Sequence, residues 1–264
     1  MGKDDLGDRM KRFERHGFGS EILLPQIPVI ARLDGKTFHS FTRGLQKPFD
    51  VRLTELMHLT TKHLIDQFHP DLAFTQSDEI TLVWVGDREL LFNGKVLKMC
   101  SSFSALASAF FCSKLPEQLP EKSHFTPTFD CRVFNLPTLT EAVNCLIWRQ
   151  MDAVRNSVSG LAQANFSHKQ LQNVGVPTMK QMLLEKGIRW EDLPADNRQG
   201  SFFRRVVFER KFTEEELQNL PENHNAHSNP DLLITRSEVR KIDLPLVVEM
   251  EDRSAILFPA KEKK

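Results

Sequence analysis

Two carboxylates, those of Asp34 and Asp78, have the clearest potential for chemistry, because each lies where a predicted strand meets a turn. Carboxylates held close together repel each other and are tolerated when a cation binds between them. Hard oxygen ligands favour Mg²⁺, which accepts phosphate oxygens as its remaining ligands. Two such ions can activate an attacking hydroxyl and stabilise a leaving oxygen in phosphoryl transfer. Either Asp alone is simply a common turn residue, so the hypothesis depends on the two meeting.

The predicted order of elements gives these aspartates a reason to meet. Apolar periodicity predicts a strand at 28–34 and then a helix capped by Asp50. Two strands at 72–76 and 79–85 follow, and then a helix at 98–114. The series ends with a strand at 129–136 and a long helix capped by Thr138 or Thr140. This order is typical of a ferredoxin-like α+β antiparallel sheet with packed helices. Its first and third strands are neighbours, so Asp34 and Asp78 would lie at one edge, as in a polymerase palm. Gly35 would allow the sharp turn there.

The second part of the chain has a weaker pattern. A short helix is predicted near 178–186 and a strand near 202–209, followed by polar and Pro-containing connections. We therefore expect residues 1–165 to form the palm-like domain. Residues 166–264 are expected to be an appended, mostly helical and irregular region that completes the same globular unit.

Composition narrows the class of protein. The 264 residues carry no net charge and have a pI near 7.1, so no global charge indicates a nucleic-acid partner. No apolar run approaches the ~18 residues that a membrane span needs. The four cysteines are widely separated and indicate neither a zinc site nor a disulfide scaffold. The absence of Tyr excludes a mechanism that needs a phenol. We expect a cytoplasmic protein without a membrane partner.

Five short motifs carry a resemblance to a known family. They are R-L-D-G-K-T-F-H at 32–39, K-P-F-D at 47–50, Q-S-D-E at 76–79, F-D-C-R-V-F at 129–134 and W-R-Q at 148–150. In type, order and spacing, over about residues 25–210, they resemble the tRNA-His guanylyltransferase superfamily. The resemblance implies a palm-like domain that adds nucleotides in the 3′-to-5′ direction.

The resemblance also implies roles for particular residues. Asp34, Asp78 and the Gly35 carbonyl match the ligands of two Mg²⁺ ions, with Glu79 as a catalytic neighbour. The residues that match binding sites for an activating ATP or GTP and for substrate nucleoside triphosphates (NTPs) are Gly35, Lys36, Thr37, Phe38, His39, Lys47, Ser77, Lys98 and Arg132. Simpler alternatives exist for four of these side chains. Lys47 and Lys98 could be ordinary surface lysines, Arg132 could pair with a carboxylate, and His39 could be a core histidine. The match favours function for Lys47 and Arg132 and leaves the other two open.

One departure from the family pattern bears on the substrate. The eukaryotic enzymes carry H-I-N-N on the helix after W-R-Q, whereas residues 154–157 read V-R-N-S. The polar stripe of Arg149, Asp152 and Asn156 on that helix is either functional or a solvated face. The motifs F-S-H-K at 166–169 and G-S-F-F-R-R at 200–205 are more similar to the bacterial and archaeal Thg1-like proteins. Those proteins are associated with templated repair of 5′-truncated tRNAs.

The resemblance therefore implies template-dependent addition of nucleotides to the 5′ end of tRNA, with the 166–264 region contributing to tRNA contact. The expected tRNA-binding residues are Arg155, Asn156, Arg204 and Arg205. Family members assemble as dimers of dimers, so a homo-oligomer, either a dimer or a tetramer, is expected. One alternative is a tRNA-His enzyme that adds a single G. Another is a non-catalytic tRNA-binding protein, which predicts loss of a metal carboxylate, yet both are present. A third alternative is a palm-like cyclase that makes a signalling nucleotide. The G-G-D-E-F motif of one such class is absent from this sequence, which counts against it.

Overall fold

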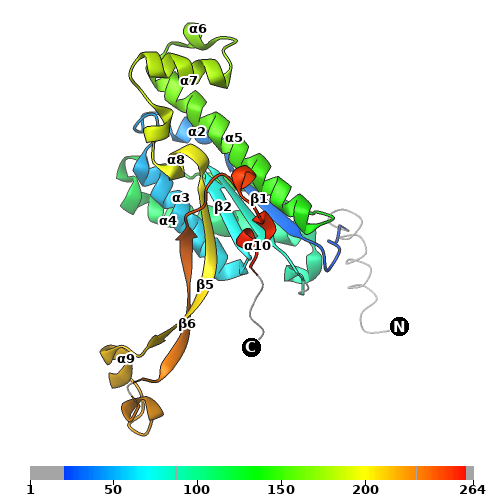
Figure 1. Cartoon of the computed structure of the whole chain (residues 1–264), viewed down its shortest axis with the longest axis vertical. Coiled ribbons are helices and arrows are strands. Elements are labelled where there is room, and N and C mark those ends of the chain that lie inside the picture. Colours follow the sequence, from blue (N-terminus) through cyan, green and yellow to red (C-terminus); the bar gives the residue numbers. More distant parts are fainter. Residues whose placement is uncertain (1–20, 87–88, 230, 260–264) are drawn as a thin grey trace.

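The computed structural model describes residues 21–86, 89–229 and 231–259 (Figure 1). The elements are β1 (Val29–Lys36), α2 (Phe38–Phe41), α3 (Val51–Phe68), β2 (Leu72–Gln76), β3 (Glu79–Trp84), α4 (Val96–Gln118), β4 (Thr128–Asn135), α5 (Leu139–Asn165), α6 (His168–Leu171), α7 (Val176–Glu185), α8 (Ala195–Gln199), β5 (Ser201–Lys211), α9 (Glu214–Gln218), β6 (Leu233–Ile242) and α10 (Arg253–Leu257). Short 3₁₀ turns lie at Leu91–Gly94, Pro120–Lys122, Trp190–Asp192, Asn225–His227 and Val247–Glu249.

Six strands form one sheet in the order β4-β1-β3-β2-β5-β6, and neighbouring strands are antiparallel. The first and third strands are neighbours, as predicted, with Asp34 opposite Glu79. The α+β fold class predicted from the sequence is confirmed. This order places the end of β1 beside the β2–β3 hairpin.

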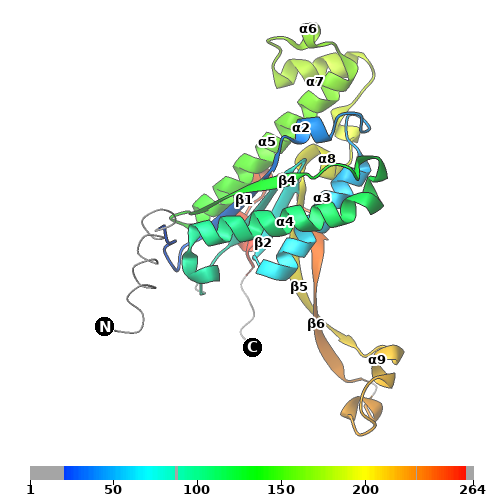
Figure 2. The same cartoon turned by 180° about the vertical axis from the view of Figure 1, so that it is seen from behind.

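Helices cover both faces of the sheet (Figures 1 and 2). Successive strand residues point to opposite faces, so β1 contributes Ala31 and Leu33 to a core with α3 and α4, and Ile30 to a core with α5. The helix α4 is long and apolar enough to cross a membrane by length and composition alone. It instead lays Phe103, Phe111 and other apolar residues against the sheet. A core helix passes the same test, so this is weak evidence for a membrane span.

Local capping fixes where the two long helices begin. The Asp50 carboxylate accepts the backbone N–H of Arg52 at the start of α3. At the start of α5 the hydroxyl of Thr138 accepts the N–H of Glu141 at 3.2 Å, which decides between the two predicted caps in favour of Thr138. Such side chains satisfy backbone donors that have no partner in the first helical turn.

The C-terminal region contains a strand that the sequence analysis missed. β6 pairs with β5 over ten residue pairs, from Phe202–Ile242 to Lys211–Leu233. The two strands form a ribbon that extends away from the helical layers, with α9 near its tip (Figure 1). At the other end of the molecule, α6 and α7 pack on the last turns of α5 around a small core of Val158, Leu161, Leu183 and Trp190.

Candidate active site

The end of β1 and the β2–β3 hairpin bring Asp34 and Asp78 together. The backbone N–H of Gly35 donates to the carbonyl oxygen of Asp78 at 3.0 Å, and Asp34 pairs with Glu79 in the sheet. Ser77, the first residue of the two-residue hairpin loop, is left-handed with φ 55°. The juxtaposition predicted from strand order is therefore present.

The two carboxylates influence each other electrostatically. Burial raises the pKa of Asp78, and the nearby charge of Asp34 raises this pKa further. Burial also raises the pKa of Glu79, and the guanidinium of Arg149 opposes that rise. A cation between Asp34 and Asp78 would relieve their repulsion.

The donors at this edge are oxygens: two carboxylates and nearby backbone carbonyls. Among the described residues, no group of three or more His, Cys, Asp or Glu side chains is arranged to hold a metal on its own. An incomplete, all-oxygen set fits Mg²⁺, which usually takes one or two carboxylates and completes its shell with water and substrate phosphates.

Charged residues form two rows across the sheet face on the α5 side. Asp34 lies opposite Glu79 of β3 and Asp130 of β4, which makes an acidic row. One step along the same face, Arg32 lies opposite Arg132 of β4. These rows become visible only from the register in which the strands pair. Arg132 lies 3.9 Å from Asp130 and is more than half exposed, so the pairing considered for it from the sequence is a loose one.

Gly35 is needed for a reason other than the one predicted. It does not adopt a left-handed conformation; the left-handed residue is Thr37, with φ 56°. A Cβ on Gly35 would lie 2.4 Å from the Phe38 ring, which is far inside van der Waals contact. The Phe38 ring itself packs against Phe41, Phe111 and Phe129. Only the backbone of Phe38 is therefore available to a nucleotide, while Lys36, Thr37 and His39 are exposed. The alternative of a core histidine at His39 is wrong.

A cavity of about 290 Å³ opens beside the β2–β3 hairpin, where it is lined by Ser77, the residue before Asp78. It brings Lys47 of the 42–50 loop together with Ser77 of the hairpin and Asn156 of α5. The loop is fixed by Asp50, whose carboxylate accepts the backbone N–H of Gln46 at 3.2 Å and binds the guanidinium of Arg52 at 2.7 Å. Three residues predicted from separate motifs thus line one cavity. The volume of this cavity is close to the lower end of the range for small-molecule sites.

Lys98 does not line this cavity. Its ammonium lies 5.2 Å from the centre of the Phe92 ring. Phe92 and Trp84 both contact Phe103, and Trp84 is the last residue of β3, at the end of the sheet remote from Asp34.

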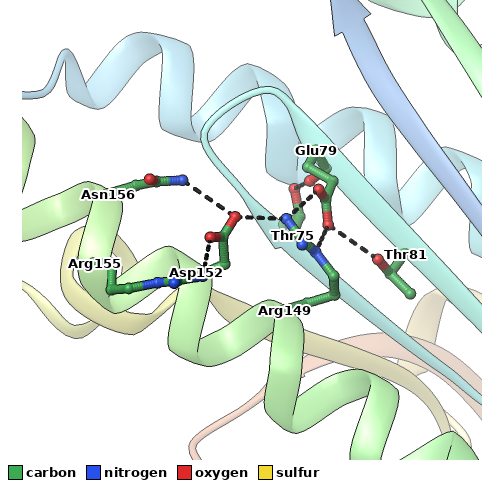
Figure 3. Close-up of polar contacts among 7 residues, drawn as sticks. All are labelled: Thr75, Glu79, Thr81, Arg149, Asp152, Arg155 and Asn156. Atoms are coloured by element: carbon green, nitrogen blue, oxygen red, sulfur yellow. Dashed lines mark hydrogen bonds and ion pairs between the residues drawn. The ribbon is translucent and has the colours of Figure 1, made fainter.

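The polar stripe on α5 forms a network of hydrogen bonds that reaches the β2–β3 hairpin through Arg149 (Figure 3). Arg149, with 11% of its side chain exposed, binds both oxygens of Glu79 at 2.6 Å. The same guanidinium binds Asp152 at 2.9 Å, and Asp152 in turn binds Arg155 at 2.6 Å. Asn156 lies 3.5 Å from Asp152. A solvated helix face is therefore the wrong interpretation for Arg149, and the sequence offered no signal for its partner.

The basic residues of the ribbon have partners within the chain. Arg204 donates to the carbonyl of Ile256 at 3.1 Å, and Arg205 pairs with Asp66 of α3. Farther out, Arg210 pairs with Glu216 at 2.7 Å, and Lys211 with Asp231. These contacts attach the ribbon to the body and stabilise its tip.

An antiparallel sheet with two aspartates at the junction of β1 and the β2–β3 hairpin defines a palm-like α+β domain. A family model described as tRNAHis guanylyltransferase (Thg1) matches residues 7–137. A solved bacterial Thg1-like protein in complex with ATP is 32% identical, with a TM-score of 0.75, and the match covers 96% of this chain and 97% of that one. The structure of the Saccharomyces cerevisiae tRNA(His) guanylyltransferase matches with 25% identity and a TM-score of 0.64, over 72% of this chain and 90% of that one. The chain belongs to the tRNA-His guanylyltransferase family.

Two curated relatives have similar sequences, and one of them carries the family's name. An uncharacterised protein of Acanthamoeba polyphaga mimivirus is 34% identical over 77% of this chain and 78% of its own length. The tRNA(His) guanylyltransferase of Debaryomyces hansenii is 33% identical over 56% of this chain and 57% of its own length. The chain thus spans little more than half of that named enzyme.

Proposed function

We propose that this chain is a magnesium-dependent nucleotidyltransferase that adds nucleotides in the 3′-to-5′ direction to the 5′ end of tRNA, directed by the opposite strand. The observation that carries the proposal is the meeting of Asp34 and Asp78 beside a cavity lined by Lys47 and Ser77. Carboxylates for a cation next to donors for a triphosphate are the parts that phosphoryl transfer requires.

Two chemical steps account for the addition. A 5′-phosphate oxygen of the tRNA attacks the α-phosphorus of ATP or GTP, and pyrophosphate leaves. The 3′-hydroxyl of an incoming NTP then attacks the activated 5′-phosphorus, and AMP or GMP leaves. Lys47 and Ser77 would bind the activating triphosphate together with the backbone of residues 35–39. Arg132 and Lys98 would neutralise phosphate charge on the second nucleotide.

Asp34, Asp78 and the Gly35 carbonyl would hold two Mg²⁺ ions. Bound there, the ions would neutralise the charge that develops on the attacking and leaving oxygens. The mutual repulsion of the two carboxylates supports this assignment.

Contact with tRNA is proposed for Arg155, Asn156, Arg204 and Arg205. Asn156 lines the cavity and Arg155 is exposed beside it, so these two are best placed near the reacting end. Arg204 and Arg205 already bind the body of the protein, so an RNA would have to share or displace those contacts. A cytoplasmic location and a dimer or tetramer complete the proposal, and sedimentation analysis of the purified chain tests the oligomer.

The deciding experiment supplies Mg²⁺, NTPs and a tRNA lacking its first nucleotide, and follows extension at the 5′ end. We expect templated extension by the wild type and none by Asp78→Ala. The matched control is Asp231→Asn, an exposed carboxylate on the ribbon, which should leave extension unchanged. The absence of extension by the wild type, or its persistence in Asp78→Ala, would reject the mechanism.

The second candidate is addition of a single G to tRNA-His, which the family assignment also supports. The departure of residues 154–157 from H-I-N-N favours the repair activity. A side-by-side assay separates the two. One G added only to tRNA-His, without dependence on the opposing base, would favour the second candidate.

A further inference from the structure

Trp148 is an exposed aromatic residue next to the proposed active site. The chain has three tryptophans, of which Trp84 and Trp190 are buried in the core while Trp148 is 50% exposed. It lies on α5, and Met151, one turn farther along the same helix, is 52% exposed. Exposed apolar side chains that stand singly are common on protein surfaces, so the case for a site rests on what the Trp148 ring contacts.

Two guanidinium groups contact the indole ring. The Arg149 guanidinium lies 4.4 Å from the ring centre and that of Arg32 lies 5.3 Å away. Arg149 is held by Glu79 and Asp152, so this side of the ring is fixed. Arg32 comes from β1, two residues before Asp34 and on the same sheet face, which separates their Cα atoms by about 7 Å. The indole is therefore within one nucleotide's reach of the paired aspartates.

Basic residues lie near the ring on the sheet side, one step along the same face from the acidic row of Asp34, Glu79 and Asp130. Arg32 lies directly opposite Arg132 on β4, and like charges in directly opposed positions destabilise a sheet. A phosphate bound by both arginines would remove this repulsion. An aromatic ring flanked by arginines is the combination that proteins use to stack a base while holding its phosphate.

We propose that Trp148 and Arg32 form a stacking site for a nucleobase of the substrate, with the attached phosphate bound by Arg132. This inference rests on the proposed function, because it assigns a subsite to the same reaction. The base could belong to the unpaired acceptor end of the tRNA or to the incoming NTP. The chemistry recognised is the same in both cases, namely a π-face next to a phosphate.

Tryptophan fluorescence provides a direct readout, since Trp148 is the exposed tryptophan. The wild type and Trp148→Phe are titrated separately with ATP, with GTP and with a tRNA transcript lacking its first nucleotide. We expect quenching in the wild type and a much smaller change in Trp148→Phe. Quenching by ATP or GTP alone assigns the base to the NTP, and quenching by the transcript alone assigns it to the RNA.

Binding measurements with labelled ligands complete the test. Loss of one base–aromatic stack corresponds to about 5- to 150-fold weaker binding, which is expected for Trp148→Leu and not for Trp148→Phe. Leu184→Ala, at an exposed apolar residue of α7, is the matched control and should bind as the wild type does. Because Trp148 is half exposed, neither substitution opens a cavity in the core.

Unchanged affinity of Trp148→Leu for all three ligands would overturn the inference, as would binding without quenching. If the wild type still extends tRNA in either case, the proposed function stands and only the stacking site fails. If the wild type quenches on binding yet does not extend tRNA, the stacking site stands and the reaction fails.

Discussion

Arg149 binds both carboxylate oxygens of Glu79, with Nε–Oε1 and Nη2–Oε2 distances of 2.6 Å. Glu79 is the first residue of β3 and follows Asp78 directly, whereas Arg149 lies in the middle of α5. The pair therefore ties α5 to the hairpin that carries Asp78 (Figure 3). Because Arg149 binds both oxygens of Glu79, we propose that this residue positions the hairpin that carries Asp78.

Removal of Arg149 should destabilise the protein strongly. In Arg149→Met the Glu79 carboxylate, 14% exposed, loses its partner, and breaking a buried pair costs about 3–5 kcal/mol. Urea unfolding measures this loss. Adding Glu79→Gln to Arg149→Met should recover part of it, because the uncompensated charge disappears. Arg155→Ala, which removes a partner of Asp152 with 59% of its side chain exposed, should change the unfolding free energy by less than about 1 kcal/mol. Equal losses for the two arginines would contradict this account.

The central strands and long helices could be predicted from the sequence because the apolar residues of each element recur with the period of a strand or of a helix. The strand predicted at 28–34 is found at Val29–Lys36, and the helix predicted at 98–114 extends over Val96–Gln118. β6 was missed because it is exposed on both faces and includes Arg236, Glu238 and Arg240, so no apolar alternation marks it.

The site was predictable as far as strand order determines it. Neighbouring strands bring Asp34 to Asp78, which follows from the topology alone. The bond between Arg149 and Glu79 and the row that includes Asp130 depend on the packing of α5 and on strand register. Neither is encoded in local spacing.

Mg²⁺ should stabilise the wild type but not Asp78→Asn. Asp34 and Asp78 repel each other without a cation, so Asp78→Asn should be at least as stable as the wild type in the presence of a chelator. A ligand that binds only the folded state stabilises it by about 2.7 kcal/mol at 100 times its Kd. Thermal unfolding with and without Mg²⁺ measures both effects. A wild type that gains no stability from Mg²⁺, or a variant that gains as much, would argue against this metal site.

His58 should make stability fall in mild acid. The side chain is buried, its Nε2 lies 3.0 Å from the Ser201 hydroxyl oxygen, and burial lowers its pKa. Nearby Asp196 and Glu55 act in the opposite direction, while Lys241 and Lys62 reinforce the lowering.

The sign of the effect follows from proton uptake. Below the unfolded value of 6.5 the unfolded chain binds a proton that folded His58 resists, so stability present above pH 6.5 is lost as the pH falls. Urea unfolding between pH 7.5 and about 5 should show a smaller loss in His58→Gln than in the wild type. The exposed His227 gives the control variant His227→Gln, which should follow the wild type.

Gly35→Ala should destabilise the edge that holds the aspartates. The new Cβ would lie 2.4 Å from the Phe38 ring, and that ring cannot simply swing away because Phe41, Phe111 and other aromatic residues enclose it. Overpacking of this kind costs about 1–3 kcal/mol, which chemical unfolding would detect.

The smaller side chain in Phe38→Leu makes room for this Cβ, so Gly35→Ala should cost less in that background than in the wild type. Gly160→Ala is the matched control, since its Cβ would meet the Phe49 ring at an ordinary 3.7 Å within α5. There, alanine should be neutral or stabilise the helix by up to about 1 kcal/mol. Additive effects of Gly35→Ala and Phe38→Leu would show that the close approach of these two residues is not what requires glycine at this position.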